Sequence, residues 1–343
     1  MRKLHSLAIG GFIVTSLACP LALQAADFGP PAIEVVDASA LKGIKRVAVT
    51  SFSVQYVTAQ VWDTSHTTGG GRTGNLQFVG QGGGFDIGNA LDPAKMQSTT
   101  ELLYQGFLSD LQSAGFDVVS AAQLANSAAY KAYAANAPAT PRREEAESQK
   151  SNGAGAITSV FHTPPGVPLV LGDKFDHLAT GRFGSNVSDP TLTFAGSLNL
   201  YTTNWPYYDK DVQKELDAAT LHVRLYVPLA HVQVASSSFW GSGYSRQGIV
   251  PGLRLGNRLT RVAVGHHGNY AKLVLSEPYL IPGPIDSTVE EVKHPNFARA
   301  MLGEKIKIYP GTFAPEKYWE LLPQAASQAL KGFAAKLRED SGS

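Results

Sequence analysis

The sequence predicts an α/β (α+β) fold: a mixed β-sheet flanked by helices, with a glycine-rich insertion after the first strand. Residues 44–58 alternate apolar and polar side chains, which is the period of a half-buried strand. Residues 96–114 carry an apolar stripe at three- and four-residue spacing, which is the period of an amphipathic helix. The second half is rich in alternating segments, most clearly over 221–229. Strands and helices that follow one another in this way are typical of layered α/β architectures.

The first 25 residues have the layout of a secretory signal peptide. Arg2 and Lys3 form a short basic region, 7–23 is mostly apolar, and Ala25 stands where signal peptidase cuts. We therefore expect a periplasmic or secreted protein. The single cysteine, Cys19, raises the alternative of an outer-membrane lipoprotein. Leu17 fits a lipobox poorly at its position two residues before Cys19, so ordinary cleavage is favoured over lipidation.

Composition excludes several classes of protein. Lys and Arg total 29 against 28 Asp and Glu, which argues against a nucleic-acid partner and against a polybasic membrane anchor. Beyond the signal peptide no run of eighteen apolar residues occurs, so membrane association would not use a transmembrane helix. Cleavage removes Cys19, which excludes disulfides, cysteine catalysis and zinc–thiolate sites from the mature chain.

The first half of the chain is predicted to begin with an extended segment, a strand, a glycine-rich insertion and a helix. An extended N-terminal segment over 26–43 precedes the strand at 44–58. Residues 63–90, rich in glycine, predict either a long loop or a hairpin with Gly69 to Gly71 at its tip. Asp92-Pro93 is a helix start signal for the segment 96–114, and Gly115 is a typical stop.

Shorter elements follow this helix. A short strand is predicted over 116–119 and a second helix over 121–135, with Ser120 as its cap. Residues 136–155 predict a polar linker. The α/β domain spans 44–338, with two lobes if the chain divides near 136–172.

The second half predicts mainly strands. Segments at 191–203, 221–229 and 232–240 alternate apolar and polar residues. Residues 259–275 predict a hairpin that turns near Gly265 to Asn269. The chain closes with an amphipathic helix over 316–337.

Two aromatic clusters are the candidate binding residues, because Trp and Tyr rings can stack on sugars or pack against a partner surface. The alternative is that they are core aromatics at strand ends. The clusters occupy 201–208 and 239–244. Their members are Tyr201, Trp205, Tyr207, Tyr208, Phe239, Trp240 and Tyr244.

No motif identifies a reaction, so no catalytic residue, cofactor or metal is predicted. The glycines from Gly69 to Gly74 lack the lysine of a phosphate-binding loop. Ser242 lies in a Gly-Ser-Gly triplet rather than the Gly-x-Ser-x-Gly of a hydrolase elbow. The acidic pairs are read as solvated charges, although a glycosidase also needs two carboxylates. They are Asp173 with Asp176 and Asp209 with Asp211.

The adjacent histidines His266 and His267 are predicted to be exposed turn residues rather than metal ligands. Neighbouring side chains on a strand point to opposite faces, so both can bind one ion only in a turn. A third ligand would have to come from His222 or His231. Metal binding is the alternative interpretation.

The order of elements resembles the α/β domain of the curli-secretion-channel (CsgG-like) family and the N-terminal domain of TolB-type periplasmic proteins. In these families the first strand reads roughly VAV-x-x-F and the helix ends in L-x-x-x-G-x-x-V-V/I. The matching positions are Val47, Ala48, Val49, Phe52, Leu111, Gly115, Val118 and Val119. The resemblance covers 44–135 and, more loosely, 175–335. It implies a non-enzymatic role in envelope assembly or secretion, through protein–protein contacts and often oligomers.

Three hypotheses follow. The first is an exported, non-catalytic envelope protein that binds a protein partner or itself, with a glycan as a further possible ligand. The second is an exported hydrolase of a glycan or ester, with Ser242 or acidic residues as candidates. The third is an oligomeric outer-membrane pore component, with 51–80 as a membrane hairpin. Channel members of the family carry a good lipobox and lack the linker at 136–172, which favours the first hypothesis over the third.

Overall fold

The computed structural model describes most of the chain from Phe28 onward. The described residues are 28–63, 82–135, 137–150, 153–169, 205–228, 230–239, 242–256, 259–287, 290–293, 301, 305–308 and 311–342. The predicted signal peptide with Cys19 and the predicted strand at 191–203 lie outside them.

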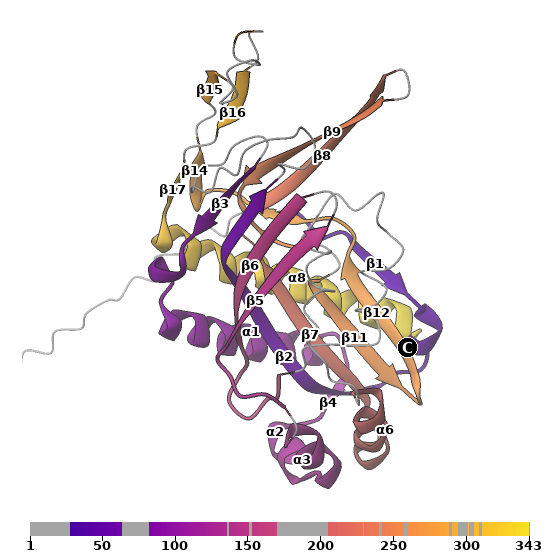
Figure 1. Cartoon of the computed structure of the whole chain (residues 1–343). Helices are drawn as coiled ribbons and strands as arrows, with labels where there is room; N and C mark the ends of the chain where they lie inside the picture. The colour runs from indigo at the N-terminus through magenta and orange to yellow at the C-terminus, as the bar shows by residue number, and fades with distance from the viewer. Residues whose placement is uncertain are drawn as a thin grey trace, which may run out of the picture.

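The fold is a mixed β-sheet flanked by helices, as the sequence predicts (Figure 1). The main path of its nine strands runs β1-β12-β11-β7-β2-β6-β5, and β3 and β4 also pair with β2. The strands are β1 (Ile33–Val36), β2 (Arg46–Asp63), β3 (Gly82–Asp86), β4 (Asp117–Val118), β5 (Arg142–Lys150), β6 (Gly153–His162), β7 (Ala219–Val227), β11 (Arg261–His266) and β12 (Asn269–Leu275). The order places β2 near the middle of the sheet.

The strand predicted at 44–58 is β2, and it continues to Asp63. Its first part pairs in parallel with β7 and β4, and its last part pairs antiparallel with β6 and β3. Because residues 59–63 face Gly82–Asp86 in antiparallel register, the glycine-rich insertion begins and ends as a hairpin. The predicted tip at Gly69 to Gly71 lies outside the described residues.

One face of the sheet is covered by α1 (Pro93–Ser113) and α8 (Pro315–Ser341), which pack against each other (Figure 1). Both helices were predicted. The Asp92 carboxylate accepts a hydrogen bond from the Ala94 N–H at 2.8 Å and caps α1, and Gly115 at φ 90° follows its end. Side chains from both helices bury against those of β2, β7, β11 and β12 in one apolar core. Its largest members include Phe52, Tyr56, Phe107, Tyr226, Tyr318 and Phe333.

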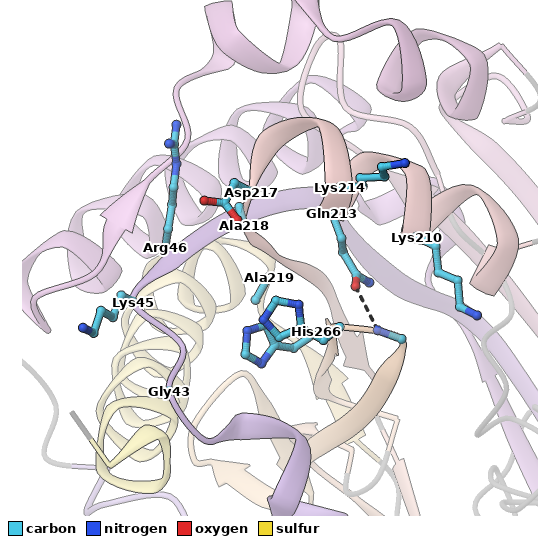
Figure 2. Close-up of a pocket in the computed structure, with 12 residues that line it drawn as sticks. Gly43, Lys45, Arg46, Lys210, Gln213, Lys214, Asp217, Ala218, Ala219 and His266 are labelled. Atoms are coloured by element: carbon cyan, nitrogen blue, oxygen red, sulfur yellow. Dashed lines mark hydrogen bonds between the residues drawn. The ribbon is translucent and has the colours of Figure 1, made fainter.

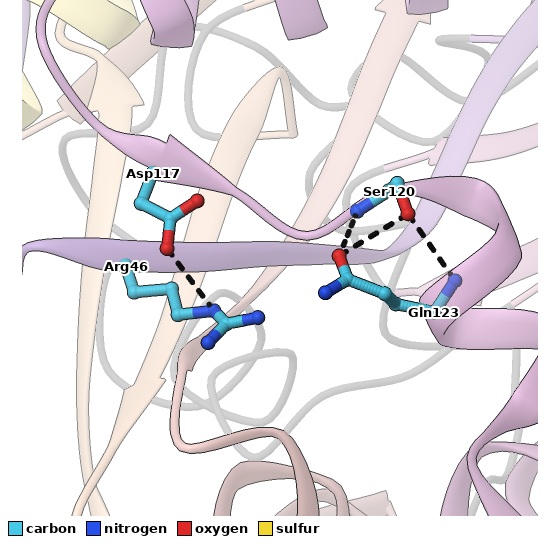
Figure 3. Close-up of polar contacts among 4 residues, drawn as sticks. All are labelled: Arg46, Asp117, Ser120 and Gln123. Atoms are coloured by element: carbon cyan, nitrogen blue, oxygen red, sulfur yellow. Dashed lines mark hydrogen bonds and ion pairs between the residues drawn. The ribbon is translucent and has the colours of Figure 1, made fainter.

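The helix predicted over 121–135 is two helices, α2 (Ala121–Asn126) and α3 (Ala128–Ala134). Ser120 caps α2 through a reciprocal pair of hydrogen bonds with Gln123, as Figure 3 shows. The break falls at Ser127, whose hydroxyl accepts from the Tyr130 N–H at 3.0 Å and caps α3. A second serine cap therefore begins a new helix within the segment that was predicted as one helix.

The helix α6 (Trp205–Leu216) lies beside α3 and against β7 and β11. Together these helices close one end of the sheet with a small apolar cluster of their own. Its buried members are Ala48, Val119, Leu124, Tyr130, Tyr133, Val212, Ala218 and Tyr270.

The polar linker predicted over 136–155 was wrong. Arg142–Lys150 is β5 and Gly153–His162 is β6, and the two form an antiparallel hairpin at the edge of the sheet. Charged residues are common on edge strands, where they oppose pairing with other chains. This is why the charged stretch from Arg142 reads as a linker in the sequence but is a strand in the fold.

The strand predicted at 221–229 is β7, but it is buried on both faces rather than one. The polar residues His222 and Arg224 are 6 % and 4 % exposed. Their side chains find polar partners: His222 Nε2 lies 3.2 Å from Thr50 Oγ1, and Arg224 Nη2 donates to Gln55 Oε1 at 2.6 Å. Alternation in this strand separates an apolar face from a hydrogen-bonded face, not core from solvent.

The remaining strands form small two-stranded sheets (Figure 1). β8 (Ala230–Phe239) pairs with β9 (Ser242–Pro251) in a long hairpin that projects at the top of the view. The other strands are β10 (Leu253–Leu255) with β13 (Tyr279–Ile281), β14 (Ile285–Ser287) with β17 (Gly311–Phe313), and β15 (Glu290–Lys293) with β16 (Lys305–Ile308). In the extended N-terminal segment, β1 is followed by the 3-10 helix η1 (Ala38–Leu41).

Candidate anion-binding pocket

The predicted aromatic residues fall on two separate parts of the fold. Trp205, Tyr207 and Tyr208 belong to α6, while Phe239 and Tyr244 lie on the hairpin β8–β9. In Figure 1, α6 lies at the bottom of the molecule and this hairpin projects at the top. Tyr201 and Trp240 lie outside the described residues. The described members therefore do not form one continuous surface.

The candidate nucleophile Ser242 lacks the setting of a hydrolase elbow. It is the first residue of β9 and pairs with Phe239, the last residue of β8. It therefore lies in a β-hairpin, and a strand rather than a helix follows it. An elbow needs a strand that turns directly into a helix. Of the acidic pairs, Asp209 and Asp211 lie on α6, and Asp173 and Asp176 fall outside the described residues.

The described residues contain no group of three His, Cys, Asp or Glu side chains that could hold a metal ion. His222, one proposed third ligand, is occupied elsewhere, with its Nδ1 3.4 Å from the Tyr133 hydroxyl. His231 lies on β8. The histidines at the turn do adopt the close arrangement that a turn permits, with ring centroids 4.1 Å apart.

A pocket of about 650 Å³ lies at the end of the sheet where these histidines are found (Figure 2). β2 and β7 begin here, β11 turns into β12, and the last turns of α6 form a wall. Its lining residues are Gly43, Lys45, Arg46, Lys210, Gln213, Lys214, Asp217, Ala218, Ala219, His266, His267 and Gly268. Among these residues, Asp217 provides the single carboxylate.

Three lysines contribute positive charge to the lining. Within the described part of the chain, no carboxylate pairs with Lys45, Lys210 or Lys214. The adjacent Glu215 is turned to α3 instead, where it accepts from the Ala128 and Ala129 N–H groups at 2.9 and 2.8 Å. These two hydrogen bonds lower the pKa of Glu215 and hold its charge away from the pocket.

The charge of Arg46 is partly offset by an ion pair with Asp117. Its Nε lies 3.4 Å from a carboxylate oxygen of Asp117, as Figure 3 shows, and the two side chains are 34 % and 68 % exposed. An ion pair this open to solvent is weak. The guanidinium therefore still contributes positive potential to the pocket.

The pocket wall is held by hydrogen bonds from Gln213. Its Oε1 accepts from the Gly268 N–H at 3.4 Å, the dashed line in Figure 2, and its Nε2 donates to Thr220 Oγ1 at 3.3 Å. His267 and Gly268 both have positive φ, 50° and 79°, which fits a type I′ hairpin turn. The glutamine thus joins α6 to this turn and to β7.

His266 is oriented by a hydrogen bond, and its surroundings lower its pKa. Its Nδ1 lies 3.2 Å from the carbonyl oxygen of Ala40, and a carbonyl can only accept, so Nδ1 carries the hydrogen. Burial and the neighbouring His267 lower the pKa of His266, and the bond to Ala40 partly opposes them.

This arrangement of side chains is suited to binding an anion. Cationic side chains at a concave surface attract and hold negative groups, and the lining offers no activated nucleophile or paired carboxylates for hydrolysis. Sequence reasoning missed the pocket because 43–46, 210–219 and 266–268 are far apart in the chain. The one local signal was Lys210 and Lys214, which share a helix face at four-residue spacing once 205–216 is read as a helix.

None of the helices within the described residues is long and apolar enough to cross a membrane. Comparisons with family models, with curated proteins and with solved structures find no match to this chain. The resemblance to CsgG-like and TolB-type domains accordingly stays a prediction.

Proposed function

We propose that this protein is an exported, non-catalytic component of the cell envelope that acts through protein–protein contacts. The basic pocket is its docking site, and the ligand is an acidic segment of a partner protein. The observation that carries the proposal is the charge of the lining, which includes the cations Lys45, Arg46, Lys210 and Lys214 and a single carboxylate, that of Asp217.

The spacing of the cations favours an extended ligand over a single small anion. Figure 2 shows Lys45 and Arg46 on one side of the pocket, Lys210 and Lys214 on the other, and His266 between them. The lysine and arginine side chains do not converge on one point, as they would around one phosphate. Several carboxylates spaced along a peptide would match this separation, and a pocket of about 650 Å³ has room for them.

Lysine also suits this kind of partner. An ammonium group is a mobile point charge without the fixed fork of a guanidinium, so it adapts to carboxylates in varied positions. Such contacts give fast, salt-sensitive association and select acidic over neutral or basic partners.

The test is binding of a fluorescently labelled peptide rich in Asp and Glu, measured by anisotropy at two salt concentrations. The double variant Lys210→Glu/Lys214→Glu should weaken binding on the order of 100-fold, because attraction becomes repulsion. Raising the salt should weaken the native interaction.

A matched control separates the pocket from overall charge. Lys95 and Lys317 are exposed and lie outside the pocket lining, and Lys95→Glu/Lys317→Glu makes the same change in net charge. This control should bind almost as well as the native protein. Equal losses in both double variants, or no loss in either, would contradict the proposal.

A second candidate is the oligomeric outer-membrane pore component, favoured by the continuation of β2 into paired hairpins. Residues 59–63 pair with β3 on one side and with β6 on the other. Size-exclusion chromatography with light scattering, with and without detergent or liposomes, tests it. A monomer that does not associate with either would contradict this candidate.

A further inference from the structure

The two histidines of the pocket form a pair in which a second proton is unfavourable. The ring centroids of His266 and His267 are 4.1 Å apart, and the planes are inclined by 36°. Two imidazolium charges at this separation repel each other. A negative group placed beside the rings would remove that obstacle.

The hydrogen bond to Ala40 decides where a new proton goes on His266. Nδ1 already carries a hydrogen, which faces the Ala40 carbonyl oxygen at 3.2 Å. The remaining nitrogen, Nε2, holds a lone pair in the neutral ring and becomes an N–H donor on protonation. The neutral ring therefore offers a carboxylate no hydrogen bond from Nε2, and the protonated ring offers one.

The other charged groups of the pocket come from several elements. β2 and the residue before it contribute Arg46 and Lys45, and α6 contributes Lys210 and Lys214. The turn contributes His267, while η1 supplies only a backbone carbonyl to His266. Positive side chains therefore predominate in the lining around His266, and Asp217 is the one lining group of opposite sign.

We propose that docking of the acidic segment is coupled to uptake of a proton at Nε2 of His266, so that the pocket binds its partner more tightly as the pH falls. This inference rests on the proposed function. No covalent bond changes: the proton comes from solvent, and the resulting N–H donates to a carboxylate of the ligand.

The direction of the pH dependence of affinity follows from the change in the pKa of His266 on binding. Bound carboxylates raise the pKa of His266 above its value in the free protein, where burial and His267 lower it. Affinity therefore rises as the pH falls through the pKa of the complex and levels off below that of the free protein. One proton gives at most about a tenfold gain per pH unit. Carboxylates of the peptide stay ionised above about pH 5, so the window near neutral pH reports the histidine.

Isothermal titration calorimetry measures the uptake directly. The Asp/Glu peptide is titrated into the protein at about pH 6.5, in two buffers that differ in heat of ionisation. The native protein should take up a substantial fraction of one proton. His266→Gln should abolish the uptake and make the affinity nearly independent of pH. The control His267→Gln should keep the uptake, with its pH midpoint shifted upward by loss of the like-charged neighbour.

The outcomes are distinct. Binding without proton uptake by the native protein would overturn the inference and leave the proposed function standing. Uptake lost in His267→Gln but kept in His266→Gln would overturn the assignment to His266. Absence of binding at every pH would overturn the proposed function itself. If His266→Gln fails to fold, the imidazole C–H resonances of the native protein replace it: the pKa of His266 must rise on addition of peptide.

Discussion

The two ends of β2 present different surfaces to another molecule. At its start, beside Lys45 and Arg46, the strand opens onto a pocket whose lining also includes residues of 210–219, with Lys210 and Lys214, and of the turn at 266–268. At its end, over 59–63, it is flanked by β3 and β6 and continues the sheet into a hairpin. The first end provides charged side chains and a cavity, and the second provides a hairpin whose strand β3 pairs only with β2 among the described strands.

The difference separates two modes of recognition. A pocket of spaced charges selects partners by their acidity and responds to salt and pH. Strands at the end of a sheet engage other chains through backbone hydrogen bonds, which discriminate sequence weakly. The proposed docking function belongs to the first end, and the second candidate, self-association, belongs to the second.

The first half of β2, which starts at the pocket, should contribute most to the stability of the fold. The substitution Phe52→Ala should therefore have the largest effect. The ring is fully buried and packs edge-on against Tyr104 at 5.4 Å. Its removal should lower the free energy of unfolding by about 3–5 kcal/mol, measured by urea denaturation. Leu102, 61 % exposed on α1, is the control, and Leu102→Ala should change it by less than about 0.5 kcal/mol. Similar decreases in the free energy of unfolding in both variants would show that Phe52 is not part of the stabilising core.

A smaller effect is expected at Gly256→Ala, next to Tyr226 of β7. A Cβ at Gly256 would lie 2.3 Å from Cδ1 of Tyr226, a buried residue that pairs with Gln55. The clash should destabilise the fold by about 1–3 kcal/mol in thermal or urea unfolding. Gly106→Ala is the matched control, because its Cβ meets no atom within 4 Å and alanine favours the helix. A neutral Gly256→Ala would show that Tyr226 repacks freely.

The smallest effect on stability is expected at Asp117→Asn, which removes the partner of Arg46. This ion pair is largely exposed, so the free energy of unfolding should change by less than about 1 kcal/mol. Affinity for the acidic peptide should instead rise a few-fold, because the guanidinium is released toward the pocket. A weaker affinity would mean that Asp117 positions Arg46 for binding.

Elements with local periodicity could be predicted from the sequence. The apolar stripe from Leu103 to Leu111, with its cap at Asp92, is sufficient to define α1. Alternation defines β2 and β7, and positive φ at His267 and Gly268 fits the predicted hairpin turn. These features depend on residues a few positions apart, which is the range that a sequence pattern reports.

Features set by tertiary pairing could not be predicted in this way. β5 lacks an apolar pattern because it is a charged edge strand, and the burial of Arg224 depends on Gln55, 169 residues away in the chain. The pocket is the extreme case, since strand pairing and the packing of α6 against β7 and β11 together bring Lys45, Lys214 and His266 to one place. Its chemistry appears only after β2, β7 and β11 are paired.

The most direct test of the account is to locate the bound peptide. An Asp/Glu peptide with a photoreactive group is crosslinked to the protein, and the attached residues are identified by mass spectrometry. The account predicts crosslinks within 43–46, 210–219 and 266–268, which Lys210→Glu/Lys214→Glu should suppress. Crosslinks concentrated on 59–63, β3 and β6, unaffected by that variant, would contradict it and move recognition to the hairpin end of β2.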